Sequence, residues 1–533
     1  MSGPSANDRA TPLDLIVLAE LLPVADRSAP EYGRPHRIDR DSLDGFLGRL
    51  RPTDPLAESA AKISTFREFR PEAMRARWLD ARVAEARAKL GAGTAQGATS
   101  TTATRSTAAP TPTVASEPAP ESPLARGSTD TPLFSDDPLA HLFDLVEAGT
   151  SMGAAHAPGA SLADRLVAEV VRSVQSQKGG GTPKAPKSAS GSSADDALRA
   201  EILRAALASP EWRALEGAWL ALRTLVRRVD FREGTRLFVV PSAPGAGVRH
   251  LRAALEGLSA DAESEGRVTV AVVGWESGAE ERAAFGAAGR EYWVPVISAA
   301  SSEEVESAVR EDRVASSDDA TSWSAATAHH CLARPLYGAA SEPVKGFAFE
   351  EGEGPTLPWI PASWLLALAI SRAFDNDGLG TEFTARPGGE IEDLPLSSEG
   401  PVDRALPTTQ LAQLARRGFA PLAALGATDR AYFPFVPVAA GDDAPENRLA
   451  HRVLMARVHA AAVAAWNSID RSLSAERAAE QLTAALTRAL TDSAGAFAAV
   501  ESVLISDRGI AVRYRALRGS LRDSSPSGIH IQH

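Results

Sequence analysis

Cysteine is almost absent from this sequence, which has a single one, Cys331, among its 533 residues. One thiol forms no disulfide within the chain and supplies no multi-cysteine metal cluster, so both classes are excluded. Long apolar runs are also missing, because no stretch reaches the roughly 18–20 residues that a membrane-spanning helix needs. Residues 1–12 are polar and lack the pattern of a secretory signal, so we expect a cytoplasmic protein without membrane insertion.

Basic residues are in deficit. The chain has 56 Lys and Arg against 68 Asp and Glu, which gives a net charge of −12. An acidic balance argues against a general nucleic-acid-binding surface, so no nucleic-acid partner is predicted. The length predicts about two to four domains.

Two stretches contain almost no large apolar side chains and divide the chain. Residues 91–132 are rich in Ala, Thr, Pro and Ser, and residues 178–194 in Gly, Lys and Ser. Neither buries enough apolar surface to offset its ordering entropy, so both are predicted to be disordered linkers. The predicted units are 1–90, 133–177 and 195–522, followed by a disordered tail at 523–533.

The first unit has the pattern of a small α/β arrangement. Leu13–Leu22 has the composition of a buried strand, although its second half also suits a helix. The other expected elements are a short strand near Ile38, a helix over Ser42–Leu50, a strand over Ile63–Phe69, and a helix over Glu72–Leu90 that follows Pro71. A unit of about 80 residues is marginally stable alone, so we expect it to need a partner.

The last unit alternates strands and helices, which predicts an α/β fold with a partly parallel sheet. It opens with a strong helical pattern that follows Pro210 and includes Trp212 and Trp219, whose expected role is core packing. The expected strands are Arg236–Val240, Arg267–Val273 and Val294–Ile297. The expected helices are Val248–Leu258, Glu280–Gly289, Trp359–Phe374, Asn447–Trp466 and Ser474–Leu490. A hairpin is expected over Ser502–Arg515.

The sequence pattern of the middle unit predicts two short amphipathic helices between the flexible stretches. Their apolar stripes are Leu139, Leu142, Phe143 and Val146, and then Leu162, Leu166, Val170 and Val174. Tethered helices of this kind bind partners or pack on the core of their own chain, and the pattern leaves both possibilities open.

Patterns that elsewhere indicate catalysis lack their structural setting here. The G-x-S-x-G match at Gly149–Gly153 has no strand before it, and Gly91, Gly93 and Gly97 lie in a linker. His329, His330 and Cys331 are adjacent, so their side chains diverge and do not chelate one ion. No catalytic residue, cofactor or metal site is predicted. An α/β enzyme with an unrecognised site is the alternative of another class.

Segments of the last unit resemble, in the right order, the large sheath subunit of type VI secretion systems, the TssC or VipB (EvpB) family. The resemblance begins in Ala200–Val229 and continues through CLARPLYG, KGFAFEE, the apolar Trp364–Phe374, GGEIEDLP and LAQLARRGFAPL. The matching residues are Pro210, Leu215, Glu216, Trp219, Leu222, Arg334, Tyr337, Gly338, Phe347, Phe349, Glu350, Gly388, Gly389, Leu394, Pro395, Gly418, Phe419 and Pro421.

The first unit is similar to the small sheath subunit, the TssB or VipA family. The similar segments are LIVLAELLP, RPHRIDRDSLDGFLGRLRP and ISTFREFRPEAM. The middle helices are similar to the N-terminal region of the large subunit. The resemblance therefore implies a small α/β TssB-like unit that is fused, through a disordered linker, to a larger TssC-like α/β sandwich with a long amphipathic helix and a mixed C-terminal part.

The resemblance also implies a function. A sheath subunit assembles with copies of itself in the cytoplasm around an inner-tube protein, and contraction drives the tube outward. Baseplate components and an AAA+ unfoldase are the other implied partners, with Leu139, Leu142, Phe143 and Val146 at the position of the unfoldase-binding helix. Residues 240–322 form a shorter stretch than the family pattern has, so a diverged, non-contractile adaptor, cap or baseplate-associated protein is the alternative.

Overall fold

The computed structural model describes residues 12–98, 167–172 and 194–531, apart from short gaps at 58–60, 311–320, 353, 355, 379, 385–388, 427, 439–443, 493–494, 507, 518–520 and 523. The chain divides into two compact units. From here on, the first unit is Met1–Val83 with Lys184–His533, and the second unit is Ala84–Pro183. Within the described ranges, no helix combines the length and apolar character that crossing a bilayer requires.

A seven-stranded sheet forms the centre of the first unit, with the strand order β10-β6-β5-β4-β1-β3-β2. The strands are β1 (Leu13–Ala19), β2 (His36–Ile38), β3 (Arg236–Pro241), β4 (Val268–Glu276), β5 (Val296–Ala299), β6 (Ser324–Thr327) and β10 (Phe419–Ala420). Neighbouring strands are parallel except for β2, which is antiparallel to β3. A mostly parallel sheet with helices between its strands confirms the predicted α/β class.

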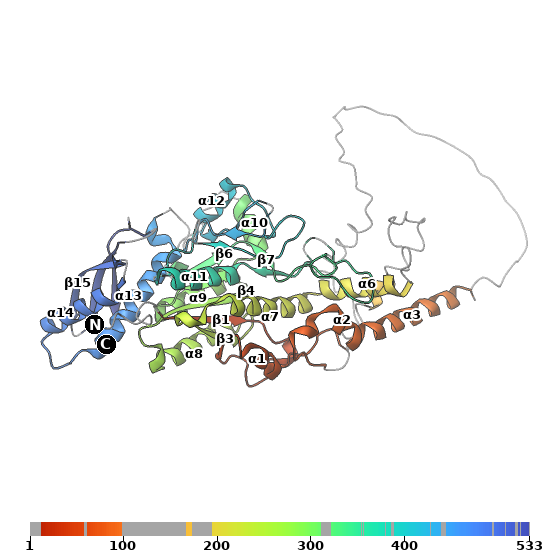
Figure 1. Cartoon of the computed structure of the whole chain (residues 1–533), viewed down its shortest axis with the longest axis horizontal. Helices are drawn as coiled ribbons and strands as arrows, with labels where there is room; N and C mark the ends of the chain where they lie inside the picture. Colours follow the sequence, from red (N-terminus) through yellow and green to blue (C-terminus); the bar gives the residue numbers. More distant parts are fainter. Residues whose placement is uncertain are drawn as a thin grey trace, which may run out of the picture. The chain divides into compact units, whose positions relative to one another are not determined.

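β1, the first strand of the chain, lies between β3 and β4 and pairs with both. All seven of its residues are buried. Figure 1 shows it in red among the yellow and green elements of the sheet. A strand covered on both faces needs apolar side chains throughout, which explains its almost continuous run of Leu, Ile, Val and Ala. Residues 12–83 therefore share their sheet with residues 194–531.

Helices cover both faces of this sheet. The helices whose bounds lie within the described residues are α1 (Leu43–Leu50), α2 (Pro71–Met74), α3 (Asp80–Ala98), α6 (Ala194–Ala208), α7 (Pro210–Arg228), α8 (Gly247–Ser259), α9 (Ala279–Tyr292), α10 (Ser302–Arg310), α11 (Ser363–Asp377), α12 (Thr408–Arg416), α13 (Leu449–Ser468) and α14 (Ala475–Ala489). Of these, α8, α9, α11 and α13 contact strands of the sheet. Leu251 of α8 and Phe285 of α9 lie in one buried cluster with Ile16 and Leu18 of β1. α11 contacts β1, β4 and β5, and α7 packs against α11.

Four smaller sheets complete the described fold of the first unit. They pair β7 (His330–Leu332) with β8 (Trp359–Pro361), β12 (Ala431–Tyr432) with β9 (Glu390–Ile391) and β11 (Ala423–Ala424), β13 (Thr491–Asp492) with β14 (Gly495–Ala496), and β16 (Gly509–Ala516) with β15 (Ala498–Ser506) and β17 (Ser527–Ile531). The β15–β16 pair confirms the predicted C-terminal hairpin.

The expected strands at 236–240, 267–273 and 294–297 and the helix α7 are confirmed within a few residues. The segment Ile63–Phe69 was predicted wrongly as a strand, because Phe66–Phe69 forms a 3₁₀ helix. Side chains three residues apart lie on one side of such a helix. The rings of Phe66 and Phe69 both pack on α7, against Trp219 and Trp212.

Three element boundaries also differ from expectation. Trp359–Pro361 forms β8 and the following helix begins only at Ser363, because proline ends the strand and interrupts helical bonding. Ser527–Ile531 forms β17 rather than a frayed tail, because it completes a sheet beside β16. α3 continues to Ala98, past the expected end at Leu90. A lack of large apolar side chains predicts weak packing, but helix propagation still adds one hydrogen bond per residue.

Candidate functional site

A buried cluster of charged side chains joins three of the segments that carry the family resemblance. Arg334 follows β7 and places its guanidinium between the carboxylates of Glu216 on α7 and Glu351. Its Nε donates to Glu216 Oε1 at 2.8 Å, and Nη1 donates to Glu351 Oε2 at 2.7 Å. The guanidinium also lies over the ring of Tyr337, 3.5 Å from its centroid. We call Glu216, Arg334, Tyr337 and Glu351 the motif cluster.

The motif cluster is closed by hydrogen bonds from Tyr337. Its backbone N–H donates to Glu351 Oε2 at 2.8 Å, and its hydroxyl lies 3.1 Å from Glu216 Oε1. Burial disfavours the charged form of Arg334, but the two carboxylates outweigh it and raise the pKa of this guanidinium well above its ordinary value. The cluster therefore holds one permanent positive charge between two acidic side chains, deep in the protein.

Residues 12–83, which we call the first segment, reach the same region of the protein. The Tyr337 hydroxyl donates to the carbonyl oxygen of Phe69 at 3.2 Å, and the indole N–H of Trp219 donates to that of Leu21 at 3.0 Å. Trp219 also packs against the ring of Phe46, with centroids 5.8 Å apart. α7 therefore connects the first segment to the motif cluster.

The other motif residues on α7 begin that helix or face its core. Pro210 occupies the first turn, where a missing N–H costs nothing, and Ser209 caps the helix by accepting from Trp212 N. Leu215 and Leu222 are buried on the helix.

The segment of Phe347, Phe349 and Glu350 lies against Gly338. The two phenylalanine side chains are buried, with their rings 6.1 Å apart. Gly338 has φ +90°, and a Cβ there would come within 2.1 Å of the Phe349 carbonyl oxygen. Glycine is therefore required at this turn. The Glu350 carbonyl oxygen accepts from Arg204 at 3.1 Å.

The remaining motif residues lie elsewhere in the first unit. Leu394 is buried and Pro395 half-buried near β9, and Gly389 is buried just before it, whereas Gly388 lies outside the described residues. Gly418 has φ +85° and turns the chain from α12 into β10. Phe419 and Pro421 are buried there.

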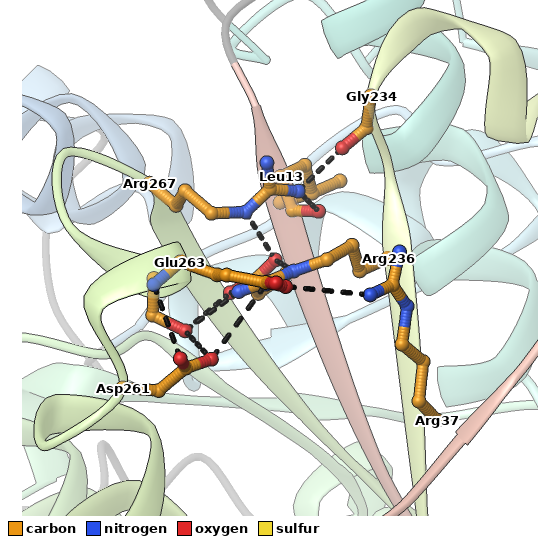
Figure 2. Close-up of polar contacts among 9 residues, drawn as sticks. Leu13, Arg37, Gly234, Arg236, Asp261, Glu263 and Arg267 are labelled. Carbon is orange, nitrogen blue, oxygen red and sulfur yellow. Dashed lines mark hydrogen bonds and ion pairs between the residues drawn. The ribbon is translucent and has the colours of Figure 1, made fainter.

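Sequence reasoning missed a second buried cluster, at the start of β1. Asp14 is completely buried, and its carboxylate accepts from Arg236 of β3 at 2.6 and 2.8 Å and from Arg267 at 2.6 Å. Arg236 also pairs with Glu263 at 3.2 Å and Asp261 at 3.7 Å. Figure 2 shows Asp261 and Glu263 beside Arg236, and Arg267 reaching the backbone of Leu13 and Gly234. We call the charged residues Asp14, Arg236, Arg267, Asp261 and Glu263 the strand cluster.

The signal for the strand cluster was present in the sequence. Asp14 is the one charged residue in the apolar run Leu13–Ala19. A carboxylate inside a strand buried on both faces needs a cationic partner. The partners themselves, more than 200 residues away, were not predictable from spacing.

A third charged group lies at the end of β4 and involves His330. Its ring pairs with Glu276 at 2.8 Å and Asp403 at 3.2 Å. Burial opposes the charged ring, but hydrogen bonds to the two carboxylates outweigh it and raise the pKa of His330 to about 9. Burial lowers the pKa of the neighbouring His329 to about 4.

Cys331 is buried, and burial raises the pKa of its thiol. Among the side chains that the structure describes, no three of His, Cys, Asp and Glu form a metal site. The sequence-predicted residues Leu139, Leu142, Phe143 and Val146, and the match at 149–153, lie outside the described residues. Residues 167–172, which include Val170 of the second predicted stripe, are helical.

The C-terminal sheet presents a strand edge. In the order β15-β16-β17, β15 is an outer strand, and its side chains alternate between exposed and half-buried positions from Ser502 to Ser506. Leu504 on this strand is 67% exposed. An outer strand carries backbone groups that can pair with another chain.

One family model matches the region of the chain that contains most of the motif residues. The model of the tail sheath N-terminal domain family, VipB: EvpB/VC_A0108, matches residues 305–437. This range includes Arg334, Tyr337 and Glu351 of the motif cluster, whereas Glu216 lies before it.

The type VI secretion system sheath protein TssC1 of Pseudomonas aeruginosa is 34% identical over 117 residues, which cover 19% of this chain and 24% of that protein. The chain thus matches about a quarter of that relative's length. The baseplate of the anti-feeding prophage, solved by cryo-electron microscopy, contains a chain with 12% identity and a TM-score of 0.34. That match covers 51% of this chain and 64% of the other. In the region that the family model matches, this chain is similar to the large sheath subunit of type VI secretion systems.

Proposed function

We propose that the protein is a structural subunit of a type VI secretion-like contractile sheath. The observation that carries this proposal is the family match over residues 305–437, together with the convergence of its motif residues on Glu216 of α7. The motif cluster packs the matched region against the rest of the α/β core. The role that follows is mechanical: copies of the chain assemble in the cytoplasm around an inner-tube protein.

The outer strand β15 supports self-assembly. A strand edge with an exposed Leu504 favours pairing with a neighbouring subunit. Purified protein is expected to form rings or tubes under negative-stain electron microscopy at high concentration. A strictly monomeric species in sedimentation, across the salt and pH conditions in which sheaths assemble, would contradict this proposal.

We also propose that the chain fuses a small-subunit part to a large-subunit part. The support is that residues 12–83 supply the interior strand β1 and pack on α7, although 110 residues lie between positions 83 and 194. If the two parts are separate partners in one sheet, cutting between them is tolerated. A protease site inserted near residue 120 is expected to yield two fragments that remain together in size-exclusion chromatography. Dissociation of the cut fragments would refute the fusion.

A diverged adaptor or baseplate-associated protein is the second candidate. The observation that favours it is the short stretch at 240–322 relative to the family pattern. Pull-down with separately expressed sheath subunits discriminates the two, because an adaptor binds in substoichiometric amounts and a sheath subunit co-assembles in proportion.

We propose that the segment Leu139–Val146, for which the sequence predicts a helix, binds an AAA+ unfoldase, with packing on the chain's own core as the alternative. Replacing Leu142 and Phe143 by Asp is expected to abolish unfoldase binding and to leave the circular dichroism spectrum unchanged. Retained binding would reject this role.

A further inference from the structure

An interior position of the sheet, between β3 and β4, is filled by a strand that is remote in sequence from both of these neighbours. β1 pairs with β3 and β4 along its length, and the chain between β1 and β3 is more than 200 residues long. The long connection from β1 to β3 therefore does not fix the register of β1, and β2, which pairs with β3, is joined to β1 only through residues 20–35. A contact within the sheet therefore has to set the register of β1.

Apolar packing alone discriminates poorly between registers. Side chains in a strand repeat every two residues, so a slip by two keeps each face of β1 on the same side of the sheet. Such a slip moves the strand by about 6.6 Å at ~3.3 Å per residue. It exchanges one branched apolar side chain for another along Leu15, Ile16, Val17 and Leu18. All four are completely buried, so the packing would accept several similar alignments.

The contacts of the strand cluster do discriminate between the observed register of β1 and a slipped one. In the observed register Asp14 is the partner of Arg236, and its carboxylate accepts from both that guanidinium and the Arg267 guanidinium. Ser264 Oγ lies 3.4 Å from the same carboxylate. A two-residue slip carries the carboxylate beyond hydrogen-bond reach of both arginines. Asp14 and Arg267 then lose their ion-pair partner in or near the core, and Arg236 keeps only Asp261 and Glu263.

The charges around this position also favour an acidic residue on the strand. Arg236 lies on β3 and Arg267 directly before β4, and the carboxylate that both of them meet, Asp14, comes with β1. Arg236 has further partners in Asp261 and the exposed Glu263, whereas Asp14 is the carboxylate that pairs with Arg267. The position therefore selects a strand that carries an acidic residue near its amino end.

We infer that Asp14, Arg236 and Arg267 are the specificity-determining contact by which the sheet recognises the first segment and fixes its register. The occupant is Leu13–Ala19 of the same chain. Buried ion pairs contribute little net stability relative to apolar replacements, whereas they discriminate well against wrong partners. This inference rests on the proposal that residues 12–83 act as a separable partner of the sheet, but not on any assembly into rings or tubes.

Disulfide trapping in the full chain tests the inference, in a background where Cys331 is replaced by Ala. Leu15→Cys with Leu237→Cys reports the observed register, because these residues are partners, and Val17→Cys with Leu237→Cys reports a slip by two. With Asp14 present, only the first pair is expected to cross-link. In the Asp14→Asn background, the yield of the slipped pair relative to the observed pair is expected to rise by about tenfold.

Asp39→Asn is the matched control. It removes one carboxylate that hydrogen-bonds Ser42 outside the strand cluster, and it should leave the trapping ratio unchanged. Because Asp14→Asn leaves unpaired arginines that weaken folding, the apolar triple variant Asp14→Leu, Arg236→Leu and Arg267→Leu is tested as well. It is expected to fold and to trap both registers. Exclusive trapping of the observed register in both variants would overturn the inference, whereas absence of tubes in microscopy bears only on the proposed function.

Discussion

The motif cluster and the strand cluster are built with opposite charge. The first holds one guanidinium, from Arg334, between two carboxylates, and the second holds one carboxylate, from Asp14, between two guanidiniums. The motif cluster is enclosed, because Arg334, Glu216 and Glu351 are all almost fully buried, whereas Glu263 of the strand cluster is 72% exposed. The comparison teaches that the same kind of ionic contact has different consequences according to whether water can replace a lost partner.

The largest effect is expected from Arg334→Leu. This change leaves two carboxylates buried without a cation, so the free energy of unfolding is expected to fall by about 4 kcal/mol. Urea denaturation followed by fluorescence measures it. Arg430 is the matched control, since it also meets two carboxylates, Glu390 and Glu392, but on the surface. If Arg430→Leu destabilised the protein as much as Arg334→Leu, the role assigned to burial would be wrong.

Asp14→Leu is expected to cost somewhat less, about 3 kcal/mol, because solvent and Glu263 partly compensate the two arginines that remain. Adding Arg236→Leu and Arg267→Leu is expected to restore most of the loss, since no charge is then left without a partner. The same denaturation experiment measures both. A triple variant that is less stable than Asp14→Leu would show that the strand cluster contributes net stability.

The third charged group, at His330, allows the effect of a buried cation to be tested by changing the pH. Like Arg334, it is a cation between two carboxylates, but its charge can be removed. Its pKa is raised from about 6.5 in the unfolded chain to about 9, so its contribution is fully present below pH 6.5 and is lost as the pH rises through 9. Because Glu276 is 39% exposed, we expect about 2 kcal/mol.

Denaturation between pH 6 and 10 measures this contribution as the difference between the parent and His330→Asn. That difference should shrink with rising pH. A constant difference across the range would contradict the assignment of a charged ring.

Tyr337→Phe is expected to have the smallest effect, about 1 kcal/mol, because it removes one hydroxyl that bonds Glu216 and the Phe69 carbonyl oxygen. Since Phe69 belongs to the first segment, hydrogen exchange around residues 66–69 should rise more than exchange in α14. An equal rise in both regions would indicate general destabilisation instead of a local connection.

The sequence predicted the elements of the core well, because periodic apolar patterns such as those of α7 and β4 report burial directly. It also identified Glu216, Arg334 and Tyr337 as motif residues through the resemblance, without indicating that they touch. Asp14 was visible as a charge in an apolar strand, but its partners depend on how distant strands are ordered in the sheet. Strand order is set by long-range packing, so no local pattern contains it.

The short 3₁₀ helix at Phe66–Phe69 was missed for a different reason. The apolar residues Ile63, Phe66 and Phe69 are three positions apart, a spacing that suits a 3₁₀ helix and lacks the alternation of a half-buried strand. The signal was therefore in the sequence, and the tryptophans of α7 supply the surface on which both rings are buried.

The place of β1 in the sheet also has a consequence for biosynthesis. The strand is made long before its neighbours, because both of them exist only after residue 276 has been added. At roughly 5–20 residues per second, the ribosome leaves this apolar strand without its pairing partners for about 10–50 s. Completion of β4 is therefore the moment at which a nascent chain first becomes able to close its core, and until then Leu13–Ala19 is a segment that the cell has to shield.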